Sequence, residues 1–342
     1  MPKPPIAPPH RAPAPVLIGL DWGTSSLRAY LFDASGSVLA RRQGGPGIMA
    51  VAEARFREAF EALCAPWLDT HPGLPVIASG MIGSRQGWRE APYVHAPAGF
   101  AEIAAGLTSL DDLAGRPFRL VPGVQASGRQ GAADVMRGEE TEVFGALAAR
   151  ALLETPDAAH RDALFVLPGT HSKWVEVRGH RIVALRTYLT GETWAVLRQH
   201  SILGRLCADP PEDDPAAQAL ALAAFDTGVR QGHAEPGALL HQLFMVRTEG
   251  LFGRFAPTQL PAYLSGLLTG TEIADAWRWC DDGPAPVLVG AGELTTRYAR
   301  AFERLGLPAS LAAEGCAAEG LFAIAVAAGL IDSPRSPTGQ SR

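Results

Sequence analysis

Short apolar runs bounded by glycine, proline or polar residues predict the first elements of the chain. Residues 16–20 are apolar throughout, which indicates a buried strand. Apolar and polar residues alternate over 27–32, and after a Ser-Gly turn residues 37–41 can form a third strand. Residues 53–64 then place apolar side chains on one face of a helix. Further elements are expected as buried strands at 75–79 and 118–121 and as a helix at 139–153.

The same opening returns in the second half of the chain. A buried strand is expected at 164–167, followed by strands at 173–177 and 181–185, with a turn before each. The first turn of each half carries the pattern Gly-Thr-x-Ser, 146 positions apart: Gly23, Thr24 and Ser26 correspond to Gly169, Thr170 and Ser172. A repeat of this length in a chain of 342 residues predicts two related domains.

Three consecutive strands followed by helices and further strands predict an α/β fold. A dinucleotide-binding fold would instead place a helix directly after the first strand. We expect two domains, 16–155 and 156–332, each with its own sheet. A Pro-rich lead-in (1–15) and a tail (333–342) are expected to be disordered.

Composition narrows the class of protein. The formal net charge of −5 disfavours nucleic acid as a partner. No apolar run is long enough to span a bilayer, and the lead-in lacks the apolar segment of a secretory signal. The four cysteines lie far apart, which disfavours a disulfide framework or a zinc site. We therefore expect a cytoplasmic protein with no membrane or nucleic-acid partner.

The two Gly-Thr-x-Ser turns are candidate phosphate-binding sites. Backbone N–H groups and hydroxyls converge in such turns, and two turns facing one cleft would hold a polyphosphate. Asp21 ends the first strand and would hold Mg²⁺, through water. Either turn alone is better explained by ordinary turn chemistry, so the matched pair carries the prediction. The candidate phosphate-binding residues are Gly23, Thr24, Ser25, Gly169, Thr170, Ser172 and Lys173, the last being the only lysine outside the lead-in.

Gly290 and Gly292 lie where a predicted strand runs into a helix. Glycine at such a junction lets an adenosine ring or a phosphate approach the backbone closely. Tight packing of the strand on the helix is the alternative explanation.

Four carboxylates precede or open the predicted helix at 139–153. Acidic side chains are favoured at a helix N-terminus, so most of them are expected to stabilise the helix. One could instead accept a hydroxyl proton during phosphoryl transfer. Glu139 and Glu140 are the first candidates for this base, with Asp134 behind them.

Residues 80–93, which are rich in glycine, arginine and aromatic residues, are expected to form a long loop after the fourth strand. Arg85 and Arg89 suit a bidentate contact with a carboxylate, and Trp88 and Tyr93 could stack on a small substrate. An ordinary surface loop is the alternative. We predict substrate binding here because loops at strand ends often carry binding sites.

Together these motifs resemble the 2-dehydro-3-deoxygalactonokinase (2-keto-3-deoxygalactonate kinase) family, within the actin-like, hexokinase and Hsp70 ATPase superfamily. The resemblance covers about residues 16–330. The segments that carry it are LDWGTSSLRAYL (20–31), SGMIGSRQGWREAPY (79–93), DVMRGEETEVFGAL (134–147), LPGTHSKWVEV (167–177), LTGETWAVLRQHSILG (189–204) and YLSGLLTGTEI (263–273).

The resemblance implies two duplicated ribonuclease-H-like domains with an interdomain cleft, the actin-like ATPase fold. It implies ATP-dependent phosphorylation of 2-dehydro-3-deoxy-D-galactonate to its 6-phosphate in galactonate catabolism, with ATP and Mg²⁺ as cofactors. ATP would lie mainly on the second domain and the sugar acid on the first. Related sugar kinases commonly use Asp as the base, whereas Glu139 and Glu140 resemble the Gly-Glu-Glu of exopolyphosphatases, which leaves the base open.

Three alternatives stay open from the residues alone. The protein could be a phosphohydrolase of the same fold, a kinase for the gluconate-derived epimer, or an ATP-gated sensor of a sugar acid. The Ala-rich closing helix, 316–330, would offer a surface for a second copy in a homodimer. A turnover assay with the purified protein would separate the kinase, the phosphohydrolase and the sensor.

Overall fold

The computed structural model describes residues 13–111, 113, 115–128, 131–153, 162–280 and 283–332. The predicted lead-in lies outside these residues up to position 12, as does the whole predicted tail. The chain forms two compact units. Unit 1 consists of the residues up to 93, residues 100–123 and those from 317 on, and unit 2 consists of 94–99 and 124–316.

Unit 1 is built on a six-stranded sheet with the strand order β3-β2-β1-β4-β7-β6. Its strands are β1 (Pro15–Trp22), β2 (Ser26–Asp33), β3 (Val38–Pro46), β4 (Val76–Ser79), β6 (Thr108–Ser109) and β7 (Phe118–Leu120). Its helices are α1 (Phe56–Thr70), α2 (Phe100–Ala105), α9 (Cys316–Ala327) and the short η1 (Ile48–Ala50), η2 (Ala52–Ala54) and η3 (Met81–Gly83). Apolar residues of the first strand, such as Leu20 and Trp22, pack with Phe60 of α1 and Phe118 of β7 in its core.

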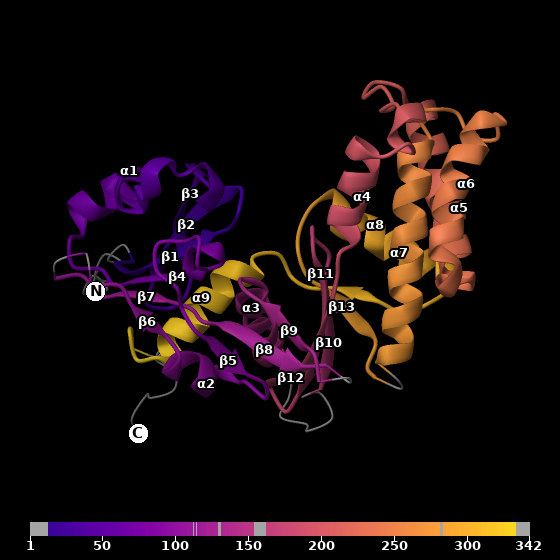
Figure 1. Ribbon diagram of the computed structural model, residues 1–342. Helices are drawn as coiled ribbons and strands as arrows, with labels where there is room; N and C mark the ends of the chain where they lie inside the picture. Colours follow the sequence, from indigo (N-terminus) through magenta and orange to yellow (C-terminus); the bar gives the residue numbers. More distant parts are fainter. Residues whose placement is uncertain are drawn as a thin grey trace, which may run out of the picture. The chain divides into compact units, whose positions relative to one another are not determined.

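Unit 2 holds a five-stranded sheet, β12-β11-β10-β13-β14, and a three-stranded sheet, β5-β8-β9. The strands are β5 (Tyr93–His95), β8 (Gly123–Ser127), β9 (Ala133–Met136), β10 (Ala163–Leu167), β11 (Ser172–Arg178), β12 (Arg181–Tyr188), β13 (Pro286–Leu288) and β14 (Ser310–Leu311). The helices are α3 (Glu139–Leu153), α4 (Thr190–His200), α5 (Pro215–Ala234), α6 (Leu239–Leu251), α7 (Leu260–Trp279), α8 (Glu293–Leu305), η5 (Gly204–Leu206) and η6 (Pro236–Ala238). In Figure 1, α5, α6 and α7 run side by side as a helical group of this unit.

The two larger sheets repeat one topology, as the sequence predicts. In unit 1, β1 pairs antiparallel with β2 and parallel with β4. In unit 2, β10 pairs antiparallel with β11 and parallel with β13. The third strand of each half, β3 or β12, adds antiparallel to the second. Each predicted Gly-Thr-x-Ser turn therefore joins the first two strands of its sheet.

Helices α5 and α7 pack against each other through glycine. A Cβ atom on Gly266 would lie 2.2 Å from the main-chain oxygen of Phe225, and one on Gly270 would lie 2.2 Å from that of Val229. Gly228 and Gly232 of α5 meet the backbone of α7 equally closely. Only glycine, which has no Cβ atom, fits at these positions, and the two helix backbones can therefore pack closely.

The compact units divide the chain differently from the predicted boundary at 155. Helix α3, expected in the first domain, falls in unit 2, and α9, expected in the second, falls in unit 1 apart from its first residue. For α9 the reason is local packing: Phe322 contacts the ring of Phe32, with centroids 5.7 Å apart, and Leu321 lies against Gly19. Leu321 and Phe322 thus pack within unit 1, and a second copy on this helix stays a prediction.

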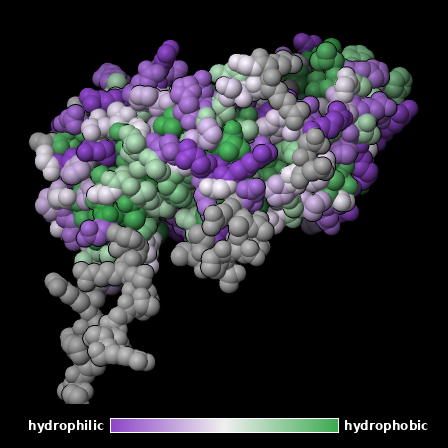
Figure 2. Space-filling view, turned by 90° about the horizontal axis from the view of Figure 1, so that it is seen from below, coloured by the Kyte–Doolittle hydropathy of each residue, from purple (hydrophilic) through white to green (hydrophobic). Residues whose placement is uncertain are grey.

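The surface and the helices bear on the membrane prediction. Among the described residues, no helix combines the length and the hydrophobicity needed to cross a bilayer. On the face shown in Figure 2, hydrophobic residues form small groups between hydrophilic ones.

Candidate active site

The first turn is anchored through its backbone and exposes its side chains. The N–H of Gly23 donates to the oxygen of Ser26, and the carbonyl oxygens of Gly23 and Thr24 accept from Ile48 and Met49. The side chains of Thr24 and Ser25 are exposed. The backbone of the turn is therefore held in place while Thr24 and Ser25 remain exposed, as a phosphate-binding turn requires.

Asp21 lies directly before this turn, at the end of β1. Its Oδ2 accepts a hydrogen bond from Arg28 Nη1 at 3.2 Å across the β1–β2 pair. Burial raises the pKa of the Asp21 carboxyl, and the guanidinium of Arg28 opposes that rise. Asp21 is the acidic group that the fold brings to the first turn.

The four residues predicted to bind substrate differ in what they contact. Trp88 stacks on Phe56 and meets Phe118 edge-on, so it belongs to the core of unit 1. Arg89 donates to the main-chain oxygen of Ser109 at 2.8 Å. Arg85, in contrast, is exposed and makes an ion pair with Glu90 at 3.0 Å. The Tyr93 side chain is also exposed.

The second turn packs against the beginning of α4. A Cβ atom on Gly191 would lie 2.5 Å from the carbonyl oxygen of Gly169, and the N–H of Glu192 donates to the oxygen of Thr170 at 2.9 Å. Nε2 of His171 lies 2.5 Å from Oε2 of Glu192. The segment LTGETW, which carried no predicted role of its own, thus forms part of the site.

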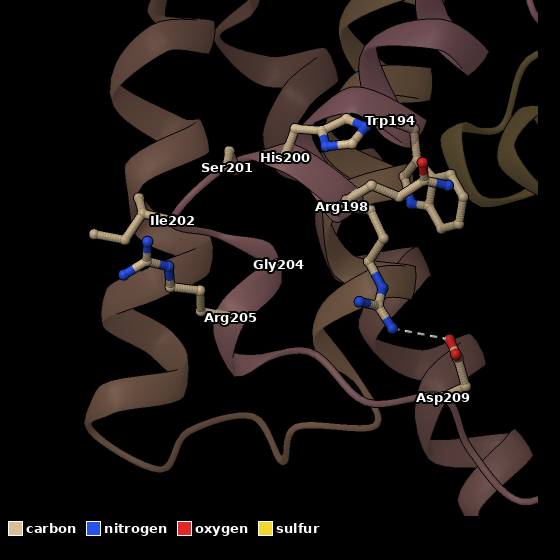
Figure 3. A pocket seen from close by; sticks show the side chains of 9 residues that line it. Trp194, Arg198, His200, Ser201, Ile202, Gly204, Arg205 and Asp209 are labelled. Atoms are coloured by element: carbon tan, nitrogen blue, oxygen red, sulfur yellow. Dashed lines mark hydrogen bonds and ion pairs between the residues drawn. The ribbon is translucent and has the colours of Figure 1, made fainter.

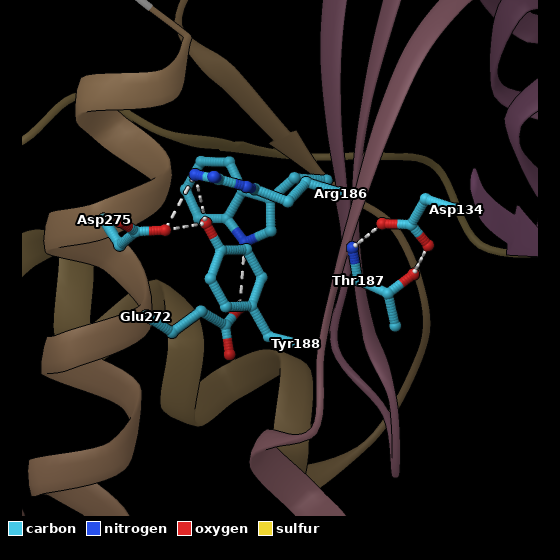
Figure 4. Close-up of polar contacts among 7 residues, drawn as sticks. Asp134, Arg186, Thr187, Tyr188, Glu272 and Asp275 are labelled. Carbon is cyan, nitrogen blue, oxygen red and sulfur yellow. Dashed lines mark hydrogen bonds and ion pairs between the residues drawn. The ribbon is translucent and has the colours of Figure 1, made fainter. Parts of the chain in front are cut away.

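Lys173 and Asp134 are joined through Thr187. The ammonium group of Lys173 donates to the oxygen of Val135 at 3.0 Å and to Oγ1 of Thr187 at 2.9 Å. Asp134 accepts from the N–H and the hydroxyl of the same threonine, at 2.8 and 2.6 Å (Figure 4). These buried or half-buried groups tie β9 to β11 and β12.

The two candidate bases at the start of α3 have different surroundings. Glu140 is fully buried, and its carboxylate accepts from the N–H of Gly138 and the hydroxyl of Thr141. Burial, with repulsion from Glu139 as the second cause, raises the pKa of Glu140 to about 8. Burial also raises the pKa of Glu139, but the charges of Lys173 and His171 oppose that rise. The fold therefore places Glu139 within electrostatic range of Lys173, which follows the second turn.

A cavity of about 420 Å³ adjoins the second turn within unit 2. Its size suits a small-molecule ligand. Helix α8, which lines it, begins directly after Gly292, and both Gly290 and Gly292 have a positive φ that favours glycine. The lining residues are Gly169, Thr170, Thr190, Gly191, Trp194, Ala195, Ser265, Leu268, Thr269, Glu293, Leu294, Arg297 and Tyr298.

Most of this lining was not predicted. The wall formed by Thr190, Trp194, Leu268 and Tyr298 comes from three helices far apart in the sequence. The available signal was that two of these segments, 189–204 and 263–273, carried the family resemblance.

A second cavity, of about 680 Å³, lies at the end of α4 (Figure 3). Trp194 borders both cavities. Arg198, which lines the second one, donates to Asp209 at 3.2 Å. Helix α4 thus separates the cavity beside the second turn from a more polar one.

The repeated sheet and the paired turns define a class of protein: duplicated ribonuclease-H-like domains of the actin-like ATPase type, as predicted. Within that class, the chain belongs to the 2-keto-3-deoxy-galactonokinase family, whose model matches residues 21–324. The family predicted from the motifs is confirmed.

Individual relatives agree with this assignment. The chain is 38% identical over 292 residues to the "Probable 2-dehydro-3-deoxygalactonokinase DgoK1" of Rhizobium meliloti (strain 1021), covering 84% of this chain and 89% of that protein. It is 35% identical to the 2-dehydro-3-deoxygalactonokinase of Escherichia coli (strain K12), covering 84% and 90%. A crystal structure from Sinorhizobium meliloti, described as a candidate 2-dehydro-3-deoxygalactonokinase, matches with a TM-score of 0.79, 34% identity and coverage of 91% and 98%.

Proposed function

We propose that this protein is a cytoplasmic kinase that transfers the γ-phosphoryl group of ATP to the 6-hydroxyl of 2-dehydro-3-deoxy-D-galactonate. Family membership supports the reaction class. The observation that carries the proposal is the cavity that joins the second turn to the start of α8 directly after Gly292. A nucleotide there has an apolar wall for its base and a backbone turn for its phosphates.

In the proposed arrangement, the base and ribose lie in the cavity and the phosphates reach the second turn. Leu268, Trp194 and Leu294 offer apolar surface to the base. The backbone of Gly169 and Thr170 offers N–H groups to the phosphates. Ser172 supports the turn, since its hydroxyl is buried and donates to Glu272, and Lys173 ties the same strand to Val135 and Thr187.

Asp21 fits the requirements of a magnesium ligand. Mg²⁺ is usually held by one or two carboxylates with waters and substrate phosphates, and Asp21 supplies one carboxylate beside the first turn. Among the described residues, no three acidic, histidine or cysteine side chains gather in a way that could hold a metal. Bound Mg²⁺ would neutralise charge on the β- and γ-phosphates.

We assign the general base to Glu139. The two oxygens of Asp134 are engaged by Thr187, and Glu140 is buried with a pKa of about 8, so it is mostly protonated at neutral pH. Burial raises the pKa of Glu139 too, but the charge of Lys173 opposes that rise, and the hydrogen bond from the N–H of Arg137 goes to Oε2. Glu139 is therefore the carboxylate best suited to accept the proton of the attacking hydroxyl.

The proposal is tested by ADP release with Mg-ATP and four conditions: 2-dehydro-3-deoxygalactonate, its gluconate-derived epimer, galactonate and no acceptor. We expect ADP only with the first acid. Equal turnover of both epimers would overturn the substrate assignment and keep the kinase. An equal rate without acceptor would identify a phosphohydrolase, and tight binding of the acid without turnover would identify a sensor.

A further inference from the structure

The segment YLSGLLTGTEI (263–273) carried the family resemblance without any predicted role. It forms the middle of α7. Its two glycines, Gly266 and Gly270, make the close contact with α5 described above. The same segment contains Glu272, a carboxylate that is 3% exposed and that the proposed chemistry does not use.

Four side chains donate hydrogen bonds to this one carboxylate. Oε1 accepts from the hydroxyl of Ser172 and from the indole N–H of Trp174, each at 2.8 Å. Oε2 accepts from the hydroxyl of Tyr298 at 2.6 Å and from that of Thr190. Since a buried carboxylate is costly unless its oxygens are hydrogen bonded, these donors account for its place in the interior.

The two carboxylate oxygens of Glu272 accept hydrogen bonds from different parts of unit 2. Both donors to Oε1 belong to β11, the strand that begins directly after the second turn. Both donors to Oε2, Thr190 and Tyr298, line the 420 Å³ cavity, from which Glu272 itself is absent. Figure 4 shows Glu272 reaching from α7 toward the strands. One carboxylate thus connects the strand of the second turn to two walls of the cavity.

The helix that carries Glu272 is itself held rigidly. At Gly266 and Gly270 its backbone packs so closely on α5 that a Cβ atom would lie 2.2 Å from a main-chain oxygen of α5. The carboxylate is therefore presented from a fixed support, as a group that orients other residues must be.

We propose that Glu272 is the positioning residue of the nucleotide cavity: it holds Thr190 and Tyr298 at a fixed place relative to the second turn. The inference rests on the proposed function, because it takes the ligand of the cavity to be a nucleotide. Glu272 does not touch the ligand, so its effect is on the geometry of the residues that do.

The test is calorimetric binding of a non-hydrolysable ATP analogue with Mg²⁺, and of the sugar acid, to the wild type and to Glu272→Gln. Glutamine replaces one acceptor oxygen with an N–H₂ group that faces donors. We expect the Kd of the analogue to rise about tenfold or more, because hydrogen bonds to the buried carboxyl group are lost. The Kd of the sugar acid should stay unchanged.

Asp226→Asn is the matched control. Asp226 is a buried carboxylate of α5 that also secures α8, through Arg300 at 2.6 and 2.8 Å, but it does not line the cavity. We expect it to lower thermal stability without changing the Kd of the analogue. An equal rise of the Kd in both variants would show that Glu272 only stabilises the fold, and would overturn the proposal.

Two further outcomes are informative. If Glu272→Gln does not fold, Ser172→Ala removes one buried donor only, and a Kd for the analogue equal to the wild type's would then overturn the proposal. If the wild type binds no nucleotide, the proposed function fails as well. If the wild type binds it and Glu272→Gln binds it equally well, only the present inference fails.

Discussion

Burial raises the pKa of Glu139, and the ammonium group of Lys173 opposes that rise. The two residues lie on different elements, the start of α3 and strand β11. Lys173 is fixed there by its hydrogen bonds to Val135 and Thr187. The only lysine outside the lead-in therefore favours the ionised form of the proposed base, against the effect of burial.

Lys173→Met is expected to raise the pKa of Glu139 further, because the opposing charge is lost. Since a base acts in its ionised form, the acidic limb of the profile of kcat/KM against pH should move to higher pH. The measurement is that profile for both proteins. An unmoved limb, in a variant that folds, would contradict the assignment of Glu139.

Glu139→Gln and Glu140→Gln should differ in activity. Loss of the proposed base is expected to lower kcat about 10²- to 10⁴-fold. Glu140 is mostly protonated at neutral pH, so glutamine resembles its normal state and kcat should change little. The measurement is kcat of both variants at pH 7. A larger loss of kcat in Glu140→Gln than in Glu139→Gln would identify Glu140 as the base.

Glu140→Gln should also change how stability depends on pH. The pKa of Glu140 is about 8 in the folded protein, against an ordinary value of 4.5. Its neutral form therefore stabilises the fold fully below about pH 4.5, and this contribution is lost as the pH rises through 8. Urea unfolding between pH 5 and 9 should show a smaller decline for the variant than for the wild type. Parallel curves for the two proteins would contradict a raised pKa of Glu140 in the folded state.

Arg85→Ala is expected to raise the KM for the sugar acid about tenfold, if Arg85 binds its carboxylate. Its ion pair with Glu90 is exposed and contributes little to stability, so the melting temperature should hardly change. Glu90→Gln is the control, because it breaks the same pair and leaves the guanidinium in place. A similar KM effect in the control would argue for a role of the pair itself.

Gly266→Ala should destabilise unit 2 by about 1–3 kcal/mol, because its Cβ would lie 2.2 Å from the oxygen of Phe225. Gly237→Ala is the comparison, since no atom lies within 4 Å of a Cβ placed there. Chemical denaturation measures both free energies of unfolding. Equal values would show that α5 and α7 can separate at little cost.

The duplicated sheets could be predicted because each strand is a short apolar run between turn residues, a local signal. The residues around Glu272 could not be predicted in this way. Ser172 and Glu272 are 100 positions apart, and their contact depends on how α7 packs against the sheet. Trp88 shows the same limit: the loop composition favoured substrate stacking, whereas its ring packs between Phe56 and Phe118. The periodicity of a sequence identifies helices and strands, but it does not show whether an aromatic ring is packed in the core or exposed to a substrate.

Helix α9 has a consequence for synthesis of the chain on the ribosome. Unit 1 begins with β1, yet Leu321 and Phe322, which cover Gly19 and Phe32, are almost the last described residues. All residues of unit 2 precede them. The helix that covers the first sheet therefore follows unit 2 in the chain, and the apolar patch at Gly19 and Phe32 stays uncovered until all of unit 2 has been synthesised.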